Sequence, residues 1–311
     1  MKRFLALTLS LASFCSSAQD FKTYDQSIPG TESTFKMAAI PAGNFTIGSP
    51  VSERGRDEDE GPQADVKISP FWMGTKEITF AEWDLYFKDV TLPQAKNLDG
   101  VTRATPQYID LTWGMGRDGK HPTNSMSHAA AVMYCKWLYS KTGIFFRLPT
   151  EAEWEYACRA GSKTAYPFGE EATALREHGY FKDNSQNKFH HVGQLKPNAW
   201  GLYDMLGNLS EWTIDQYDPA YYSKISAQDP TTNPVSKYPK TVKGGSYLSE
   251  SKELRCANRL ASDASWNKRD PQIPKSKCWL TDGMFVGFRV VRPLKQPSAE
   301  EIEKFFALYL K

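Results

Sequence analysis

Apolar and polar residues follow different patterns along the chain, and each pattern predicts a different element. From Met37 to Gly48, short apolar runs alternate with Gly and Pro, as is typical of hairpins. Residues 66–72 form a second strand candidate. Residues 79–87 and 128–139 have the period of short helices. Beyond residue 161, Gly, Pro, Asn and Trp dominate, which indicates irregular backbone held by buried aromatic side chains.

The clearest local signal is a helix that begins after Thr150. The Thr150 hydroxyl is placed to cap the helix, and Glu153, three residues later, is placed to bond back to the capping residue. Glu151 adds negative charge at the positive end of the helix. Gly161 ends the helix.

The last segment, residues 294–311, predicts an amphipathic helix. Ser298 and Glu301 form another capping box. Apolar side chains then recur at helical spacing, at Ile302, Phe305, Phe306 and Tyr309. This apolar face packs either on the chain's own domain or in the groove of a partner, and the pattern leaves both open.

The first segment, residues 1–18, has the features of a signal peptide. Lys2 and Arg3 precede an apolar stretch, and small residues lead up to an expected cleavage after Ala18. The stretch is shorter than the roughly 20 residues that a membrane-spanning helix requires, and no later stretch is apolar enough. We therefore expect export to a periplasm, a cell envelope or the medium. A lipoprotein anchor at Cys15 is disfavoured by the bulky Phe14 before it.

Composition places the remaining chain among ordinary folded proteins, since 24% of the 311 residues are charged and 40% are hydrophobic. Residues 19–35 are polar and unpatterned, which predicts a tether, and residues 36–293 are expected to form one domain. Without Lys2 and Arg3 the basic and acidic residues balance at 36 each. This balance argues against nucleic acid or an anionic membrane as the main partner. The acidic stretch 52–62 predicts a solvated loop.

Four cysteines remain after the leader: Cys135, Cys158, Cys256 and Cys278. In an oxidising compartment an even number favours two disulfides, for which three pairings exist. The alternative is four buried thiols, because a core of this size does not need covalent cross-links. The absence of a Cys-x-x-Cys motif argues against a zinc ribbon or a thioredoxin-like site.

Several ordered blocks resemble the formylglycine-generating enzyme family, also called sulfatase-modifying factors. The blocks are residues 37–48, 147–161, 201–213 and 242–247, followed by Val-Gly-Phe-Arg-Val-Val at 286–291. The resemblance covers about residues 36–293. It implies a single α+β domain of the C-type-lectin-like class, with little regular secondary structure and with bound Ca²⁺.

The resemblance implies a calcium site in the third block. Its ligands would be the side chains of Asp204 and Glu211 and the carbonyl oxygens of Gly207 and Leu209. Ca²⁺ takes six to eight oxygen ligands, and a loop that turns through a glycine supplies carbonyls and carboxylates together. The alternative is that the two acidic side chains cap turns without a metal.

The resemblance to the family's second calcium site is only partial. Asn184 and the carbonyl of Ser185 match half of the family's ligands, but Gln186 stands where that site takes an Asp. A neutral amide offers Ca²⁺ less charge than a carboxylate. Calcium is the cofactor that the resemblance implies for this chain.

Copper is not expected. The family's enzymes bind Cu(I) and activate O₂ with two cysteines a few residues after the Gly-Gly-Ser-Tyr block. In this chain Ser249 stands at the first cysteine's position, and residues 248–255 contain no cysteine. Cu(I) requires soft thiolate ligands, so neither Ser nor Glu can replace them.

The resemblance also implies how the cysteines pair. Cys158 and Cys256 match two structural cysteines of the family that form a disulfide. Cys135 matches another structural cysteine, but Val290 stands at its partner's position. Cys135 would therefore have to pair with Cys278, which lies in a segment without a family counterpart.

Histidines offer little support for another metal centre. They are His121, His128, His178, His190 and His191, and no His-x-x-x-His occurs. His190 and His191 are adjacent, so we expect them to point to opposite faces of a strand and to offer one ligand at most. A Gly-x-Ser-x-Gly motif, a phosphate-binding loop and a catalytic Cys-His pattern are absent.

These observations predict an exported binding or scaffold module for a protein, peptide or glycan. Its ligand surface is expected around residues 246–280, with polar contacts from Ser246, Ser249, Glu250, Arg255 and Arg259. Such residues are also common as plain surface residues or as packing ion pairs. The alternative is an oxidoreductase of the family that acts on a protein or small-molecule thiol. It would require a reducible thiol at Cys256 or Cys278 near Ser249.

Overall fold

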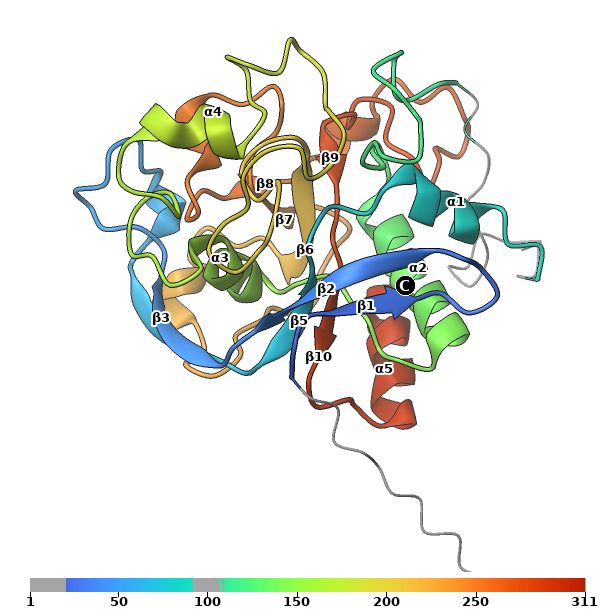
Figure 1. Ribbon diagram of the computed structural model, residues 1–311, viewed down its shortest axis with the longest axis horizontal. Helices are drawn as coiled ribbons and strands as arrows, with labels where there is room; N and C mark the ends of the chain where they lie inside the picture. Colours follow the sequence, from blue (N-terminus) through green and yellow to red (C-terminus); the bar gives the residue numbers. More distant parts are fainter. Residues whose placement is uncertain (1–20, 92–106, 108, 311) are drawn as a thin grey trace, which may run out of the picture.

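A computed structural model describes residues 21–91, 107 and 109–310. The expected signal peptide lies outside the described residues. Short helices and strands alternate with long irregular segments (Figure 1), in agreement with an α+β class that has little regular structure. Within the described part of the chain, no helix is long and apolar enough to cross a membrane.

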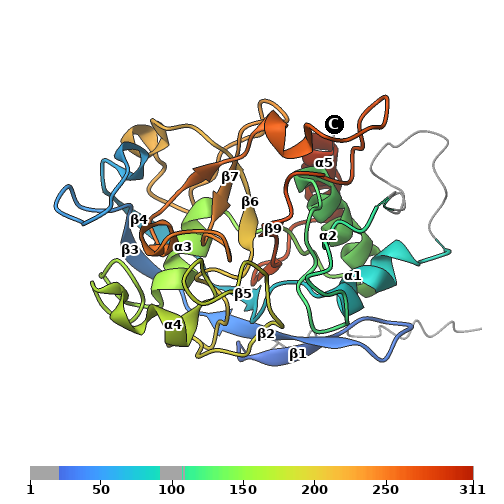
Figure 2. The same cartoon turned by 90° about the horizontal axis from the view of Figure 1, so that it is seen from above.

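The strands within the described residues form three small sheets. The first has the order β1-β2-β5-β10, the second is β3-β4, and the third has the order β8-β7-β6-β9. All pairs are antiparallel except β6 and β9. Figure 2 shows β6 between α3 and α2. The bounds are β1 Tyr24–Ser27, β2 Thr34–Ile40, β3 Gly43–Ile47, β4 Ala64–Ile68, β5 Phe71–Gly74, β6 Ser210–Gln216, β7 Lys240–Lys243, β8 Leu260–Ala261, β9 Val286–Gly287 and β10 Val291–Pro293.

The expected hairpin between residues 37 and 48 is wrong in its pairing. β2 pairs with β1 and β5, whereas β3 pairs with β4 in another sheet. The side chain of Tyr156 occupies the corner between them, since its hydroxyl donates to the carbonyl of Pro41 at 3.1 Å. A Cβ added at Gly43 would lie 2.2 Å from the same hydroxyl oxygen. The chain therefore leaves one sheet and enters the next at this corner.

The predicted tether is also corrected, because β1 and the start of β2 lie within residues 19–35. Tyr24 pairs with Met37 in this edge strand, and Ser27 pairs with Thr34. Gln26 is the one buried side chain of β1. An edge strand held by backbone hydrogen bonds needs no alternation of apolar residues, so the sequence pattern did not reveal it.

The helices agree with the predicted capping signals. In α3, the Thr150 amide donates to the Glu153 carboxylate at 2.8 Å, and the Glu153 amide donates to the Thr150 hydroxyl at 3.1 Å. Ser298 and Glu301 form the same box before α5. The bounds are α1 Phe80–Phe87, α2 His128–Thr142, α3 Glu151–Arg159, α4 Leu175–His178 and α5 Ala299–Tyr309.

The first sheet is buried on both faces and divides the core. Side chains alternate between the faces of a strand, so Trp72 of β5 packs into one apolar cluster while Phe71 and Met73 pack into the other. The first cluster includes α2 and α5, and the second includes α3. This arrangement anchors both helices and the loops that follow them to one framework.

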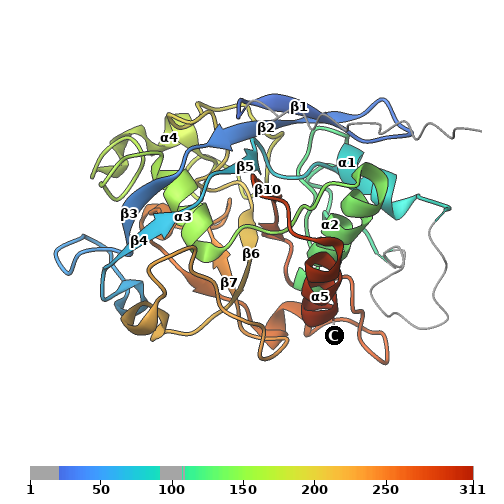
Figure 3. The same ribbon diagram turned by 90° about the horizontal axis from the view of Figure 1, so that it is seen from below.

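The final helix docks on its own domain. Ile302 and Phe306 are buried in the cluster that contains α2, and Figure 3 shows α5 beside α2. The ring of Phe306 lies 5.8 Å from that of Phe145 and 6.4 Å from that of Tyr139. Ile302 and Phe306 therefore follow the first of the two alternatives, docking on the chain's own domain, and a partner contact through the rest of the helix stays a prediction.

The acidic stretch 52–62 is more than a solvated loop. Glu60 is fully buried, and its carboxylate accepts a hydrogen bond from the Ser49 hydroxyl at 2.7 Å. Arg255 donates to both of its oxygens at 2.6 Å. A buried carboxylate requires such a partner, and this one comes from almost 200 residues further along the chain.

Candidate functional site

Ser249, which the resemblance places at the first copper-binding position, lies in a closed turn after β7. Its amide donates to the Ser246 carbonyl at 3.0 Å, and its hydroxyl accepts a hydrogen bond from the Ser246 amide at 3.1 Å. The Ser249 carbonyl accepts from the Lys182 amide at 3.0 Å. Ser249 is half-buried, whereas Leu248 and Glu250 on either side are exposed. The turn thus presents its flanking side chains to solvent and uses Ser249 to hold its shape.

A polar hollow of about 740 Å³ lies beside this turn. One wall comes from residues 50–55, another from residues 165–172, and the third from Glu250, Ser251 and Lys252. The hydroxyl of Tyr166 donates to the Ser251 carbonyl at 2.9 Å, which ties two of the walls together. The lining carries Glu170, Glu171 and Glu250 against Arg54 and Lys252, so charges of both signs face the cavity.

Arg255 reaches the edge of this hollow but is not an available ligand contact. Its guanidinium is bound to Glu53 at 2.7 Å and to Glu60 at 2.6 Å, and the side chain is 1% exposed. Although burial opposes ionisation of Glu60, hydrogen bonds from Arg255 and Ser49 lower the pKa of that carboxyl. The expectation of a surface contact at Arg255 is therefore wrong, because the side chain fixes the acidic loop in place.

Arg259 and Ser246 are also structural. Arg259 is buried, pairs with Glu151 of α3, and lies over the rings of Tyr217 and Tyr222 at 4.8 and 4.6 Å. Ser246 is buried, and its hydroxyl accepts a hydrogen bond from the Leu248 amide at 3.2 Å. Of the five expected ligand contacts, only Ser249 and Glu250 reach the surface.

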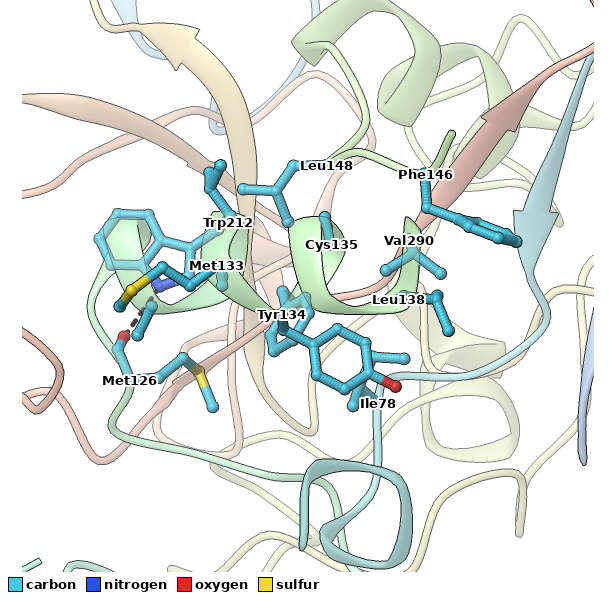
Figure 4. Close-up of a cluster of buried hydrophobic side chains, with 14 of the residues drawn as sticks. Ile78, Met126, Met133, Tyr134, Cys135, Leu138, Phe146, Leu148, Trp212 and Val290 are labelled. Carbon is cyan, nitrogen blue, oxygen red and sulfur yellow. Dashed lines mark hydrogen bonds between the residues drawn. The ribbon is translucent and has the colours of Figure 1, made fainter. Parts of the chain in front are cut away.

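The cysteines form one disulfide rather than two. Cys158 of α3 is joined to Cys256, as the resemblance implied. Cys135 and Cys278 are both buried outside this disulfide, so the second expected pairing is wrong. Cys135 lies on α2 near Leu148 and Val290 (Figure 4).

Cys278 and Cys135 meet α2 at different places. The Ser127 amide, at the start of α2, donates to the Cys278 carbonyl at 2.8 Å. Cys135 stands eight residues further along the helix, roughly 12 Å from Ser127 at the usual rise. Apolar Val290 lies near Cys135, at the position where the resemblance implied a partner cysteine.

The predicted calcium loop has an irregular backbone. Asp204, Gly207 and Asn208 all adopt positive φ, at 55°, 86° and 55°. Gly207 is required here, because a Cβ would lie 2.1 Å from the carbonyl oxygen of Tyr180. Asp204 is buried and accepts a hydrogen bond from the Gly193 amide at 2.6 Å.

The charges around this loop do not balance. Glu211 is paired with Arg289, and Trp154 donates to the same carboxylate at 2.8 Å. Asp204 and Glu77 add two more buried carboxylates near this pair. Burial raises the pKa of Asp204 to about 6, and burial followed by repulsion from Asp204 and Glu211 raises that of Glu77 well above its usual value. Arg289 faces all three carboxylates, and the charge of Lys76 also lowers the pKa of Asp204. The remaining excess of carboxylates suits an additional cation, although both oxygens of Glu211 already accept hydrogen bonds from Arg289.

The atoms of the half-matched second calcium site have protein partners. The Asn184 side chain accepts from the Phe181 amide at 2.8 Å and donates to the Gly179 carbonyl at 2.9 Å. The Ser185 carbonyl accepts from Nε2 of His190 at 2.8 Å. These contacts close a turn with protein groups, and calcium at this site stays a prediction.

One polar cluster was missed by the sequence patterns. Asp118, His121 and His191 meet at the surface, although 70 residues separate the two histidines. The neighbouring His190 points elsewhere, since its ring stacks on Tyr180 at 3.8 Å, but residues 190–191 lie in a loop and not in the expected strand. No spacing rule finds this group, because two distant loops bring its members together.

The chain is similar to known proteins in sequence and in fold. The family model described as "Sulfatase-modifying factor enzyme 1-like domain" matches residues 25–294. The "Formylglycine-generating enzyme" of Mus musculus is 28% identical over 269 residues, which cover 72% of this chain and 70% of the mouse protein. The "Serine/threonine-protein kinase pkn1" of Chlamydia pneumoniae is 31% identical over 231 residues, and the match covers 72% of this chain but only 35% of the chlamydial protein.

A solved structure has the same fold over most of the chain. The structure of PvdO from Pseudomonas aeruginosa superposes with a TM-score of 0.69 and 26% identity. The superposition covers 88% of this chain and 98% of PvdO. The similarity therefore spans most of both chains.

Proposed function

This chain belongs to the sulfatase-modifying factor enzyme 1-like family, and on that premise we propose that it is a binding or scaffold module without the copper chemistry of the family's enzymes. Its ligand would be a protein, peptide or glycan. The contact surface would be the Ser249 turn and the polar hollow beside it.

The observation that carries the proposal is the state of the four cysteines in the fold. Of the four cysteines after residue 18, Cys158 and Cys256 are consumed by a disulfide. Cys135 is buried, and burial raises its thiol pKa far above the usual value. Cys278 is buried at the start of α2. Cu(I) needs a pair of soft thiolates at one position, and Ser249 supplies none.

The alternative, a thiol oxidoreductase of the family, draws no support from these contacts. It needs Cys256 or Cys278 as a reducible thiol near Ser249. Cys256 is in the disulfide, and Cys278 lies against the start of α2. The backbone of the Ser249 turn instead contacts the Lys182 segment.

The hollow supports binding of a polar ligand. Its exposed side chains include Glu250 and Lys252, which carry opposite charges one residue apart. Glu250 pairs with Lys182 at 3.1 Å across an exposed surface, and such pairs contribute little to stability. The charged groups are therefore available for exchange with those of a ligand, as in peptide or glycan recognition.

We also propose that the module is exported and holds calcium. The Cys158–Cys256 disulfide supports an oxidising compartment such as a periplasm, a cell envelope or the extracellular medium. The buried carboxylates of Glu77 and Asp204, beside the Glu211–Arg289 pair, support a cation in the 204–211 loop. Ca²⁺ would draw on Asp204 and on the carbonyls of Gly207 and Leu209, and would stabilise the loop rather than take part in chemistry.

Two measurements test the proposal together. Purified protein from residue 19 onward is screened on peptide and glycan arrays, and is also incubated with Cu(I), O₂ and a cysteine-containing peptide. We expect saturable binding to an array member and no oxidation of the peptide thiol. Copper-dependent conversion of the peptide, or an array without any specific binding, would contradict the proposal.

A charge exchange locates the surface. The double variant Glu250→Lys with Lys252→Glu reverses two charges in the hollow at constant net charge, and should weaken binding at least about tenfold, or 1.4 kcal/mol. The matched control exchanges Glu300 and Lys304, an exposed ion pair on α5, and should bind as wild type. Equal binding by the two variants would place the ligand elsewhere.

A further inference from the structure

Asp118, His121 and His191 form a compact group outside the surfaces described above. Oδ1 of Asp118 lies 3.1 Å from Nδ1 of His121, and Oδ2 lies 2.9 Å from Nε2 of His191. One ligand atom from each residue lies within 4.8 Å of the others. The two imidazole rings approach to 4.2 Å between centroids. Both rings therefore face a single carboxylate.

The fold holds one half of this group in a pinned turn. The amide of His121 donates to the Asp118 carbonyl at 3.1 Å, and the amide of Lys120 donates to the Asp118 carboxylate at 2.9 Å. The His121 carbonyl accepts from the amide of Phe80, the first residue of α1. Gly116 packs on the His121 ring, since a Cβ there would lie 2.4 Å from a ring carbon.

The other half is tied to the same turn through the backbone. The amide of Val192 donates to the Lys120 carbonyl at 3.0 Å, which sets His191 beside Asp118. On one side of it, the His190 amide donates to Asn208 at 2.8 Å. On the other side, the Gly193 amide donates to Asp204. The position of the His191 imidazole is thus set by main-chain contacts and not by its ion pair alone.

Protein contacts alone leave this group incompletely satisfied. Nδ1 of His121 is buried and has no hydrogen-bond partner in the described part of the chain, despite its distance of 3.1 Å from Asp118. A neutral imidazole has one nitrogen with a free lone pair. Two protonated imidazoles this close would repel each other, whereas a cation between them would use both lone pairs and the carboxylate.

We propose that Asp118, His121 and His191 bind a divalent transition-metal ion, with Zn²⁺ as the reference ion. Imidazole and carboxylate suit such ions, and three protein ligands with open remaining positions are typical of exposed zinc sites. Ligand atoms about 2.0–2.1 Å from a tetrahedral ion lie roughly 3.3 Å apart. Here Oδ2 of Asp118 lies 2.9 Å from His191 and Oδ1 lies 3.1 Å from His121. One ligand atom from each residue lies within 4.8 Å of the others, so side-chain rotations would bring the three donors to the spacing that the ion needs.

The site leaves room for a further ligand. Asp118 is exposed and both histidines are half-buried, so water or a donor group from a bound molecule can reach the ion. The His121 ring lies 5.8 Å from Phe189, and Phe189 lies 6.0 Å from Tyr247. Tyr247 is part of the Ser249 turn, between Ser246 and Ser249. This inference goes beyond the proposed function and does not depend on it.

Zinc titration of the tag-free protein tests the site. Wild type should bind one equivalent of Zn²⁺ in competition with a chromophoric chelator. His191→Gln should weaken binding more than about 100-fold, because losing a ligand costs more than losing an outer partner, which costs roughly 10- to 100-fold. His190→Gln is the matched control, since its ring points toward Ser185 instead, and it should bind as wild type.

A second set of measurements tests the site even if His191→Gln fails to fold. In wild type, Co²⁺ substitution and X-ray absorption should report nitrogen and oxygen ligands with imidazole scattering and no sulfur. Asp118→Asn should weaken Zn²⁺ binding without changing the thermal midpoint of the metal-free protein by more than a few degrees. Absence of saturable binding, sulfur ligation, or equal affinity in His191→Gln and wild type would overturn the assignment.

Discussion

Arg289 and Glu211 form a two-point ion pair inside the protein, with Nη2 to Oε1 at 2.6 Å and Nε to Oε2 at 2.7 Å. Both side chains are at most 1% exposed. Arg289 also donates to the carbonyls of Gly74 and Tyr203. The pair therefore links the first sheet, β6 and the predicted calcium loop.

Removing the guanidinium should cost much more than removing a surface charge. Arg289→Leu leaves Glu211 buried without its partner, and we expect the free energy of unfolding to fall by about 3–5 kcal/mol. The control Lys304→Leu removes an exposed pair on α5 and should change it by at most about 0.5 kcal/mol. Urea denaturation followed by fluorescence measures both. Equal, small effects would contradict the structural role of the pair.

Phe306 tests whether the last helix belongs to the domain. Its side chain is fully buried between α2 and the segment of Phe145. Phe306→Ala should lower the free energy of unfolding by about 3–5 kcal/mol. Glu303→Ala, on the exposed face, should leave it nearly unchanged. If Phe306→Ala left stability unaltered but abolished a protein complex, the helix would be a partner surface after all.

His128 predicts a pH dependence of stability. Nε2–H donates to the Thr213 carbonyl at 3.0 Å, and burial, followed by repulsion from Lys240, lowers the pKa to about 3. The unfolded chain binds this proton below about 6.5 and the folded chain does not. Stability should therefore fall as pH decreases from about 6.5 toward 3, by up to about 1.4 kcal/mol per unit from this group.

The variant His128→Gln isolates the contribution of His128 to the pH dependence of stability. The glutamine amide can still donate to Thr213 but takes up no proton in this range. Its free energy of unfolding, measured against pH by urea denaturation, should decline less than that of wild type below pH 6.5. Parallel curves for the two proteins would show that His128 is protonated in the folded state.

Calcium should stabilise the protein through Asp204. A ligand that binds only the folded state, at a concentration 100 times its Kd, adds about 2.7 kcal/mol to the free energy of unfolding. After chelation, added Ca²⁺ should therefore raise the Tm of wild type, and Asp204→Asn should reduce that rise. The matched control is Asp25→Asn, because Asp25 of β1 forms only an exposed ion pair with Lys36 of β2. A Tm insensitive to Ca²⁺ in wild type would leave the loop stabilised by Arg289 alone.

Local signals in the sequence predicted the parts of the fold that local contacts determine. Thr150 with Glu153, and Ser298 with Glu301, each satisfy backbone groups within three residues, so sequence shows these helix starts directly. The Cys158–Cys256 pairing came from resemblance to a family, since four cysteines alone allow three pairings.

The functional surface was harder to predict because its residues have distant partners. Arg255 looked like a ligand contact, yet it is bound to Glu60 across 195 positions of the chain. His121 and His191 show no common motif, yet two pinned loops bring their rings together. Single-sequence patterns report periodicity and caps, whereas such pairs depend on the packing of whole loops.

Cysteine accessibility with and without Cu(I) tests the central claim most directly. Native protein is alkylated before and after unfolding without reductant, and the labelled peptides are identified by mass spectrometry. We predict that Cys135 and Cys278 are labelled only after unfolding, that Cys158 and Cys256 appear as one cross-linked peptide, and that Cu(I) changes nothing. A native thiol pair that Cu(I) protects from alkylation would contradict the account and would favour the alternative, a copper-dependent oxidase.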